Sequence, residues 1–127
     1  MKNLYKLIVL SGMALFLGSC YYDTFPEETG TVPDEVSYQQ DVQPIWNAAC
    51  TECHGNIPPT LDDGVSYANL INGGYVVPGD AQNSVLYQSL LGIEGVSLMP
   101  TQAAGGKLPD SQINIVKKWI DDGAENN

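Results

Sequence analysis

Positive charge is scarce in this chain of 127 residues, which has 5 Lys and Arg against 15 Asp and Glu and a formal net charge of −10. A chain this acidic repels the phosphates of nucleic acids and the anionic headgroups of membranes, so neither is expected as a ligand. A protein partner with a basic docking face is the more natural expectation. No feature of the sequence indicates a small-molecule substrate.

Apolar runs long enough to cross a bilayer are also missing. The run from Leu7 to Leu17 is shorter than the about 20 residues that a spanning helix needs. It follows Lys2 and Lys6 and precedes small residues, which is the pattern of a secretory signal peptide over residues 1–19. The chain is therefore expected to be exported.

Cysteine is scarce and odd in number, because three cysteines would leave one unpaired in a simple disulfide framework. Cys20 follows Leu17-Gly18-Ser19, and this tetrapeptide resembles the lipobox of bacterial lipoproteins. The resemblance implies cleavage before Cys20 and attachment of lipid to that residue. The alternative is a plain secretory peptide cut near Cys20, which would leave a free thiol.

Cleavage at that point would remove 19 of the 127 residues with Lys2 and Lys6, leaving 108 residues with three cations, 15 acids and a net charge of −12. Residues 20–36 contain five acids, two prolines and a glycine without helical or strand periodicity, which predicts a flexible tether. We therefore expect a protein lipid-anchored to a bacterial membrane. Tyr21 rather than an aspartate follows Cys20, which favours the outer membrane, and the periplasmic face is preferred to the external one.

Alternating strand patterns are lacking, and residues 37–127 have helical spacing instead. Ser37 and Gln40 resemble a capping box that begins a short turn over residues 37–40. Helices are expected over residues 41–53 and 65–71, from a cap at Asn83 or Ser84 to Leu91, and from Asp110 to a stop at Gly123. Trp46 and Trp119 are expected on apolar faces. The sequence predicts a small all-α domain with long loops, which are unusual unless they wrap something that fills the middle.

Cys50-Thr51-Glu52-Cys53-His54 is the C-x-x-C-H motif by which c-type haem is attached. Thiols three residues apart on one helical turn reach the two vinyl groups on one edge of a haem, and the adjacent histidine ligates the iron. Export is consistent with this cofactor, because c-type haem is attached on the far side of the membrane. We expect one covalent haem c, held by Cys50 and Cys53 and ligated by His54.

Three alternatives to a haem fit this motif less well. A thioredoxin-like redox pair needs a βαβ pattern that the sequence lacks. A zinc site needs four ligands, and the domain offers two cysteines and one histidine. An incidental disulfide between Cys50 and Cys53 is the least specific of the three.

The expected mature chain contains one histidine, His54, and one methionine, Met99, because Met1 and Met13 leave with the signal peptide. Because no second histidine is available, Met99 is expected as the second axial ligand. A thioether in that position raises the reduction potential of haem iron, as in cytochromes c. Met99 would otherwise only pack in the core. The sixth position would then be taken by water or by a lysine, namely Lys107, Lys117 or Lys118.

Several segments together resemble the small mono-haem cytochrome c domains of exported bacterial proteins, especially Bacteroidetes-type lipoproteins. These segments are DVQPIWNAACTECHG (41–55), VVPGDAQNSVLYQSLLG (76–92), the pair Met99-Pro100 and LPDSQINIVKKWIDDGA (108–124). The resemblance implies a cytochrome c-like fold over residues 37–127, in which the first and last helices cross over the haem. It also implies that the carbonyl of Pro58 or Pro59 holds the Nδ1–H of His54.

The leading functional expectation is outer-sphere electron transfer by a His/Met-ligated haem, and not an enzymatic activity. A peroxidase-like haem enzyme or a ligand sensor would need an open distal site, which Met99 would fill. A third alternative is an accessory binding module of a larger redox complex.

Overall fold

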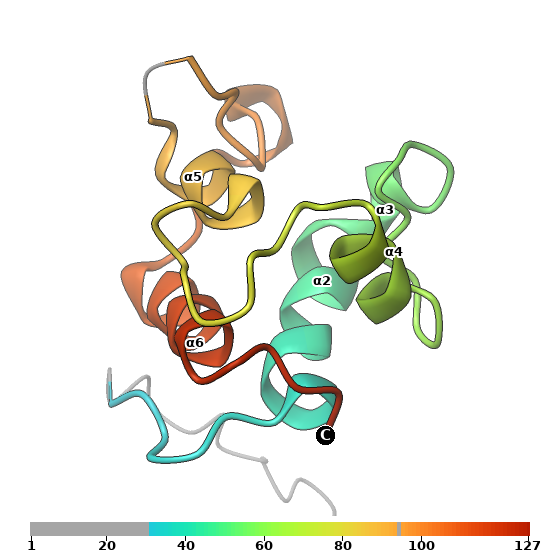
Figure 1. Ribbon diagram of the computed structural model, residues 1–127. Coiled ribbons are helices and arrows are strands. Elements are labelled where there is room, and N and C mark those ends of the chain that lie inside the picture. The colour runs from blue at the N-terminus through green and yellow to red at the C-terminus, as the bar shows by residue number, and fades with distance from the viewer. Residues whose placement is uncertain (1–30, 94) are drawn as a thin grey trace, which may run out of the picture.

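The computed structural model describes residues 31–93 and 95–127 of the chain. All regular elements in these residues are helical and none is a strand (Figure 1), so the expectation of an all-α fold is confirmed for this part of the chain. The elements in chain order are η1 Tyr38–Val42, α2 Gln43–Ala49, α3 Thr51–His54, α4 Ser66–Asn72, α5 Val85–Leu91, η2 Gln102–Ala104 and α6 Asp110–Asp121. The expected signal peptide and Cys20 lie outside the described residues.

The first helical segment consists of three short pieces, η1, α2 and α3, whereas a short turn over residues 37–40 and one helix over residues 41–53 were expected. The Ser37 hydroxyl accepts a hydrogen bond from the N–H of Gln40 at 3.3 Å, as expected for a capping residue. The side chain that bonds back to Ser37 is that of Asp41 and not that of Gln40. The Asp41 carboxylate accepts a hydrogen bond from the N–H of Ser37 at 2.8 Å. The π-helical turn η1 then leads into α2, with Pro44 in the first turn, where its missing N–H breaks no helical bond.

The helices α4 and α5 are each seven residues long and end at glycines. Gly74 follows the end of α4 with φ 72°, and Gly92 ends α5 with φ 65°. Both values lie in the left-handed region, which glycine adopts without the steric cost that a Cβ would add. These glycines turn the chain sharply into the connections that follow.

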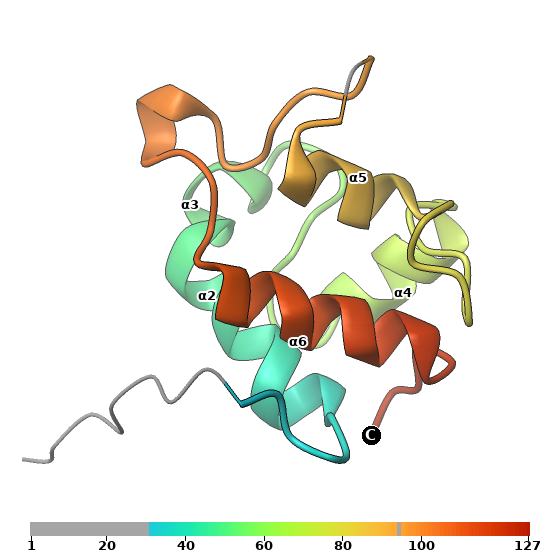
Figure 2. The same ribbon diagram turned by 90° about the vertical axis from the view of Figure 1, so that its left-hand side faces the viewer.

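The last helix, α6, runs across α2 in Figure 2 and closes the core. Its buried side chains are Ile113, Val116, Trp119 and Ile120. The Trp119 ring lies 5.0 Å from the ring of Tyr38 in η1 and 6.4 Å from the ring of Tyr67 in α4, measured between centroids. Tilted and edge-to-face aromatic pairs at such distances are favourable beyond their buried area. The two ends of the described region are therefore joined through one aromatic cluster.

The residues that precede η1 also contribute to packing. Val36 is 7% exposed and belongs to the buried core. The partly buried Val32 packs against this core. Residues 31–36 fall within the stretch expected to be a tether, and at these two positions the stretch contacts the folded domain.

Candidate functional site

The cysteines of the C-x-x-C-H motif lie where α2 gives way to α3. The backbone leaves helical geometry at Cys50, with φ −125° and ψ −37°, and resumes it at Thr51. The N–H of His54 donates to the carbonyl of Cys50 at 2.8 Å, which closes one turn around the motif. Cys50 is half-buried, Cys53 is exposed, and both thiols are free. One short turn therefore carries both thiols and the adjacent imidazole.

The imidazole of His54 is oriented by main-chain carbonyls. Its Nδ1 lies 3.0 Å from the carbonyl oxygen of Ile57 and 3.0 Å from that of Pro59. Since a carbonyl only accepts, Nδ1 carries the proton of the neutral imidazole, and in that form Nε2 has a lone pair for a metal. Of the two prolines considered from sequence, Pro59 makes this contact. The additional acceptor, Ile57, was not foreseen, because a backbone carbonyl leaves no trace in residue identity.

Met99 is held in place by α5. Its N–H donates to the carbonyl of Ser89 at 2.9 Å, and the hydroxyl of Ser89 donates to the carbonyl of Leu86 at 2.7 Å. The half-buried Met99 is followed by the buried Pro100. The loop that contains Met99 is therefore hydrogen-bonded to α5 at Met99 itself.

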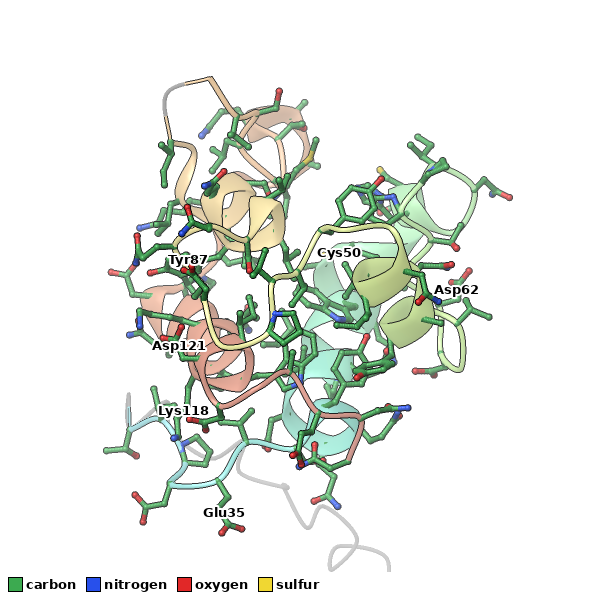
Figure 3. The ribbon with its side chains drawn as sticks, viewed as in Figure 1. Glu35, Cys50, Asp62, Tyr87, Lys118 and Asp121 are labelled. Atoms are coloured by element: carbon green, nitrogen blue, oxygen red, sulfur yellow. The ribbon has the colours of Figure 1, made fainter. Side chains whose placement is uncertain are left out.

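A cavity of about 490 Å³ brings these residues together. Cys50, Cys53, His54 and Met99 all line it, although Met99 lies 45 residues beyond His54 in the chain. In Figure 3 Cys50 appears between α5 and α4. Apolar side chains form much of the wall, among them Trp46, Leu61, Leu70, Leu86 and Leu90. Among the described residues, no side chain of Asp, Glu, Lys or Arg lines this cavity.

The lysines considered as alternative ligands are engaged elsewhere. Lys107 donates to Asp110 at 2.8 Å and Lys118 to Asp122 at 2.8 Å, and Lys117 is paired with Asp121. Lys107 borders a second, more open hollow of about 740 Å³, which also touches Cys50 and Cys53. None of these lysines contributes to the wall of the cavity that Met99 lines.

The protonation of Cys50 bears on the thiol chemistry of the site. Burial, together with the neighbouring Cys53, raises the pKa of the Cys50 thiol to about 11. Reactive thiols of redox enzymes have lowered pKa values, because the thiolate is the nucleophile. The environment of Cys50 is therefore unlike that of a thioredoxin-type or nucleophilic cysteine.

The residues of the cavity fit a covalently bound haem. Two thiols three residues apart suit attachment to one edge of the macrocycle, and an imidazole with a free Nε2 and a thioether are the two axial ligands of cytochromes c. An apolar wall suits the faces of a porphyrin. Trp46 also lines this cavity and is fully buried, and its Nε1 is a buried polar atom without a hydrogen bond within the described residues. Burial is the main cause that raises the pKa of the nearby Tyr38 phenol.

Sequence reasoning missed a group of buried polar residues beside the site. Gln43 and Ser66 are 2% and 1% exposed, and the hydroxyl of Tyr38 donates to Ser66 at 2.7 Å. Gln43 stands three positions before Trp46 on the apolar side of α2. A polar residue on an apolar helix face was the available signal.

Two features are absent from the part of the chain that the structure describes. No group of three or more His, Cys, Asp or Glu side chains that could hold a metal ion occurs in residues 31–93 and 95–127. Nor does this part of the chain contain a helix of the length and hydropathy needed to cross a bilayer.

Comparison with known proteins gives one informative likeness. No protein-family model matches the chain, and no curated protein matches it. The structure is similar to that of hydrazine synthase from Kuenenia stuttgartiensis, with a TM-score of 0.58 and 28% sequence identity. The match covers 72% of this chain and 16% of the hydrazine synthase chain, so it spans only a small part of that larger protein.

Proposed function

We propose that this protein is a mono-haem c-type cytochrome that carries electrons. The observation that carries the proposal is the lining of one apolar cavity by Cys50, Cys53, His54 and Met99. In this assignment Cys50 and Cys53 hold one haem covalently, and His54 and Met99 ligate its iron. The group supplies a single-electron couple between Fe(III) and Fe(II) when bound.

The fold supports the same assignment. In a cytochrome c-like arrangement the first and last helices cross and the haem lies beneath them, and α6 runs across α2 here (Figure 2). The likeness to hydrazine synthase extends to 72% of the chain at 28% identity. It is consistent with a helical domain whose fold also occurs within a larger protein.

An electron carrier is favoured over a peroxidase-like enzyme or a ligand sensor. Those functions need an open distal position, whereas Met99 lines the cavity and is fixed through Ser89. Peroxide chemistry also needs a distal acid or base. Among the described residues, His54 is the only histidine, its Nδ1 is already engaged, and no carboxylate lines the cavity.

The proposed setting is a bacterial membrane, with lipid on Cys20 as the anchor and the outer membrane favoured. A net charge of −12 in the mature chain favours a redox partner with a basic docking face. Each of the three lysines in the described residues is paired with an aspartate, which leaves the acidic charge dominant at the surface.

The decisive experiment is spectroscopy of the protein made in a host that attaches c-type haem. Haem that stays with the chain after denaturation, with one haem per chain and a low-spin spectrum in both oxidation states, is the expected result. The Cys50→Ser, Cys53→Ser double variant is the control, since it keeps His54 and Met99 but offers no thiol. A wild-type protein that acquires no covalent haem in such a host would overturn the proposal.

A further inference from the structure

Gln43, Ser66 and Tyr38 form a hydrogen-bonded chain in the interior. The hydroxyl of Tyr38 donates to Ser66 Oγ at 2.7 Å, and Ser66 Oγ donates to Gln43 Oε1. Tyr38 is fully buried, and Gln43 and Ser66 are nearly so. Buried polar groups are costly unless they are satisfied, and apolar side chains would join these helices equally well. The choice of polar residues at these positions therefore calls for a reason beyond packing.

The chain of donors fixes which way the Gln43 amide points. Because Ser66 uses its proton on Gln43 Oε1, the amide nitrogen must face the opposite side. There Nε2 donates to the carbonyl of Leu61 at 3.0 Å and to Asn47 Oδ1 at 2.9 Å. The Leu61 contact is buried, so it is shielded from competition with water.

Leu61 ends the segment that orients His54. The N–H of Leu61 donates to the carbonyl of His54 at 2.8 Å, so the segment is closed into a loop on the histidine. Within that loop the carbonyls of Ile57 and Pro59 accept from Nδ1. The direction of these two carbonyls depends on how the loop is held.

A second amide holds the same loop from α4. Asn69 Nδ2 donates to the carbonyl of Thr60 at 3.0 Å and also contacts the Thr60 hydroxyl. Gln43 from α2 and Asn69 from α4 thus donate hydrogen bonds to two adjacent carbonyls, those of Leu61 and Thr60. The two carbonyls that accept these bonds follow directly after that of Pro59 in the chain.

We infer that Gln43 and Asn69 are positioning residues that tune the iron ligand His54 through the loop of residues 57–61. The inference rests on the proposed function, because it concerns the strength of His54 as a haem ligand. A well-aligned hydrogen bond from Nδ1–H makes the imidazole a more basic ligand and favours Fe(III). Loosening the loop weakens that bond, and the reduction potential rises.

The test uses Gln43→Met, which keeps side-chain volume and removes the amide. We expect covalent haem to be retained and the equilibrium constant for reduction by a reference couple to rise by about tenfold. The exchange of the His54 Nδ1 proton with solvent, followed by NMR, should become faster. Asn69→Leu should shift both quantities in the same direction and serves as the second variant if Gln43→Met does not fold.

Ser84→Ala is the matched control. Ser84 is fully buried and hydrogen-bonded to the carbonyl of Asp80 at 2.8 Å and the N–H of Val77 at 2.9 Å, away from the loop of residues 57–61. It should lower the melting temperature without changing the potential or the Nδ1 exchange. If both loop variants keep their haem and their potentials match that of Ser84→Ala, the positioning role is wrong while the cytochrome assignment stands. If the wild-type protein holds no haem, the proposed function itself fails.

Discussion

The carboxylate of Asp121 accepts a hydrogen bond from the N–H of Ala81 at 3.0 Å. This contact joins α6 to the connection that leads into α5, the helix on which Met99 is fastened. The N–H of Gly79 reinforces it by donating to the carbonyl of Ile120 at 2.7 Å. Lys117 pairs with the same carboxylate, and Figure 3 labels Asp121 at the side of α6 below Tyr87.

Replacing Asp121 by Asn should weaken this junction modestly. The variant loses an exposed ion pair with Lys117 and a charged acceptor for Ala81, so the free energy of unfolding should fall by about 1 kcal/mol. Asp122→Asn is the matched control, because Asp122 pairs with Lys118 at 2.8 Å on the same helix. Denaturant unfolding of the two variants should rank Asp121→Asn as the less stable one. Equal stabilities would mean that the contact with Ala81 contributes nothing.

The difference in stability between the wild-type protein and Asp121→Asn should depend on pH in one direction. The hydrogen bond from Lys117 is the main cause that lowers the pKa of the Asp121 carboxyl in the folded protein. A depressed folded-state pKa stabilises the protein above the unfolded pKa, and the gain is lost as pH falls through the folded value. The gap between wild type and Asp121→Asn should therefore be full near neutral pH and vanish in acid. A gap that widens in acid would contradict this account.

Removing both haem thiols should cost the domain most of its structure. A domain this small buries little apolar surface by itself, and without haem the wall of the 490 Å³ cavity would face water. We expect Cys50→Ser, Cys53→Ser to be largely unfolded by circular dichroism. Cys50→Ser alone keeps one thioether and should retain helical structure. A cooperative, haem-free melting transition of the double variant at ordinary temperature would refute the prediction.

Much of the helical pattern could be predicted from sequence, because periodicity and glycine stops are local signals. The helix expected at 65–71 corresponds to α4, displaced by one residue, and α5 begins directly after Ser84, one of the two expected caps, and ends at Leu91 as expected. The break at Cys50 could not be predicted, since nothing in a run of helix-compatible residues marks a departure from helical geometry. The reciprocal cap on Ser37 from Asp41 instead of Gln40 was also missed, because both residues can serve at that spacing.

The site was partly accessible to the same reasoning. The C-x-x-C-H motif identifies Cys50, Cys53 and His54 as haem-binding residues, and Met99 was predicted because it is the one methionine of the expected mature chain. These four residues could therefore be proposed without coordinates. The groups that hold these residues in place could not be predicted, because they are backbone carbonyls and buried side-chain amides from segments distant in the sequence. Gln43 reaches Leu61 and Asn69 reaches Thr60 only once α2 and α4 are packed beside the loop.

Lipid attachment predicts a simple outcome for Cys20→Ser. The residue lies outside the described part of the chain, so the expectation comes from the lipobox resemblance and the acidic stretch after it. The variant should leave the membrane fraction while keeping its haem, as measured by fractionation and haem staining. A variant found in the membrane pellet with unchanged processing would remove the basis for the lipoprotein assignment.

Charge predicts how partner docking responds to salt. With a net charge of −12 expected for the mature chain, the rate of electron transfer to a basic partner should fall as ionic strength rises. Stopped-flow kinetics with the physiological partner measures this, and a small uncharged reductant provides the control, because its rate should change little. A partner reaction indifferent to salt would mean that docking depends on apolar contacts instead.

The identity of the sixth ligand decides between an electron carrier and an enzyme or sensor. Met99 lines the cavity from the side of α5, and its N–H is held by Ser89 at 2.9 Å. A thioether on iron gives a low-spin centre, a relatively high potential and no ready reaction with small exogenous ligands. The oxidised protein should accordingly show the methionine-to-iron charge-transfer band in the near infrared.

Met99→Ala should abolish that band, lower the reduction potential and allow carbon monoxide or cyanide to bind readily. Leu98→Ala is the matched control, because Leu98 is the adjacent half-buried side chain and does not line the cavity. It should keep the band and the potential, even if truncating this side chain beside Gly92 lowers the stability somewhat. If the wild-type protein is already high-spin and takes up carbon monoxide rapidly, Met99 is not the ligand. The distal site would then be open, and a peroxidase-like or sensing function would replace electron transfer as the better assignment.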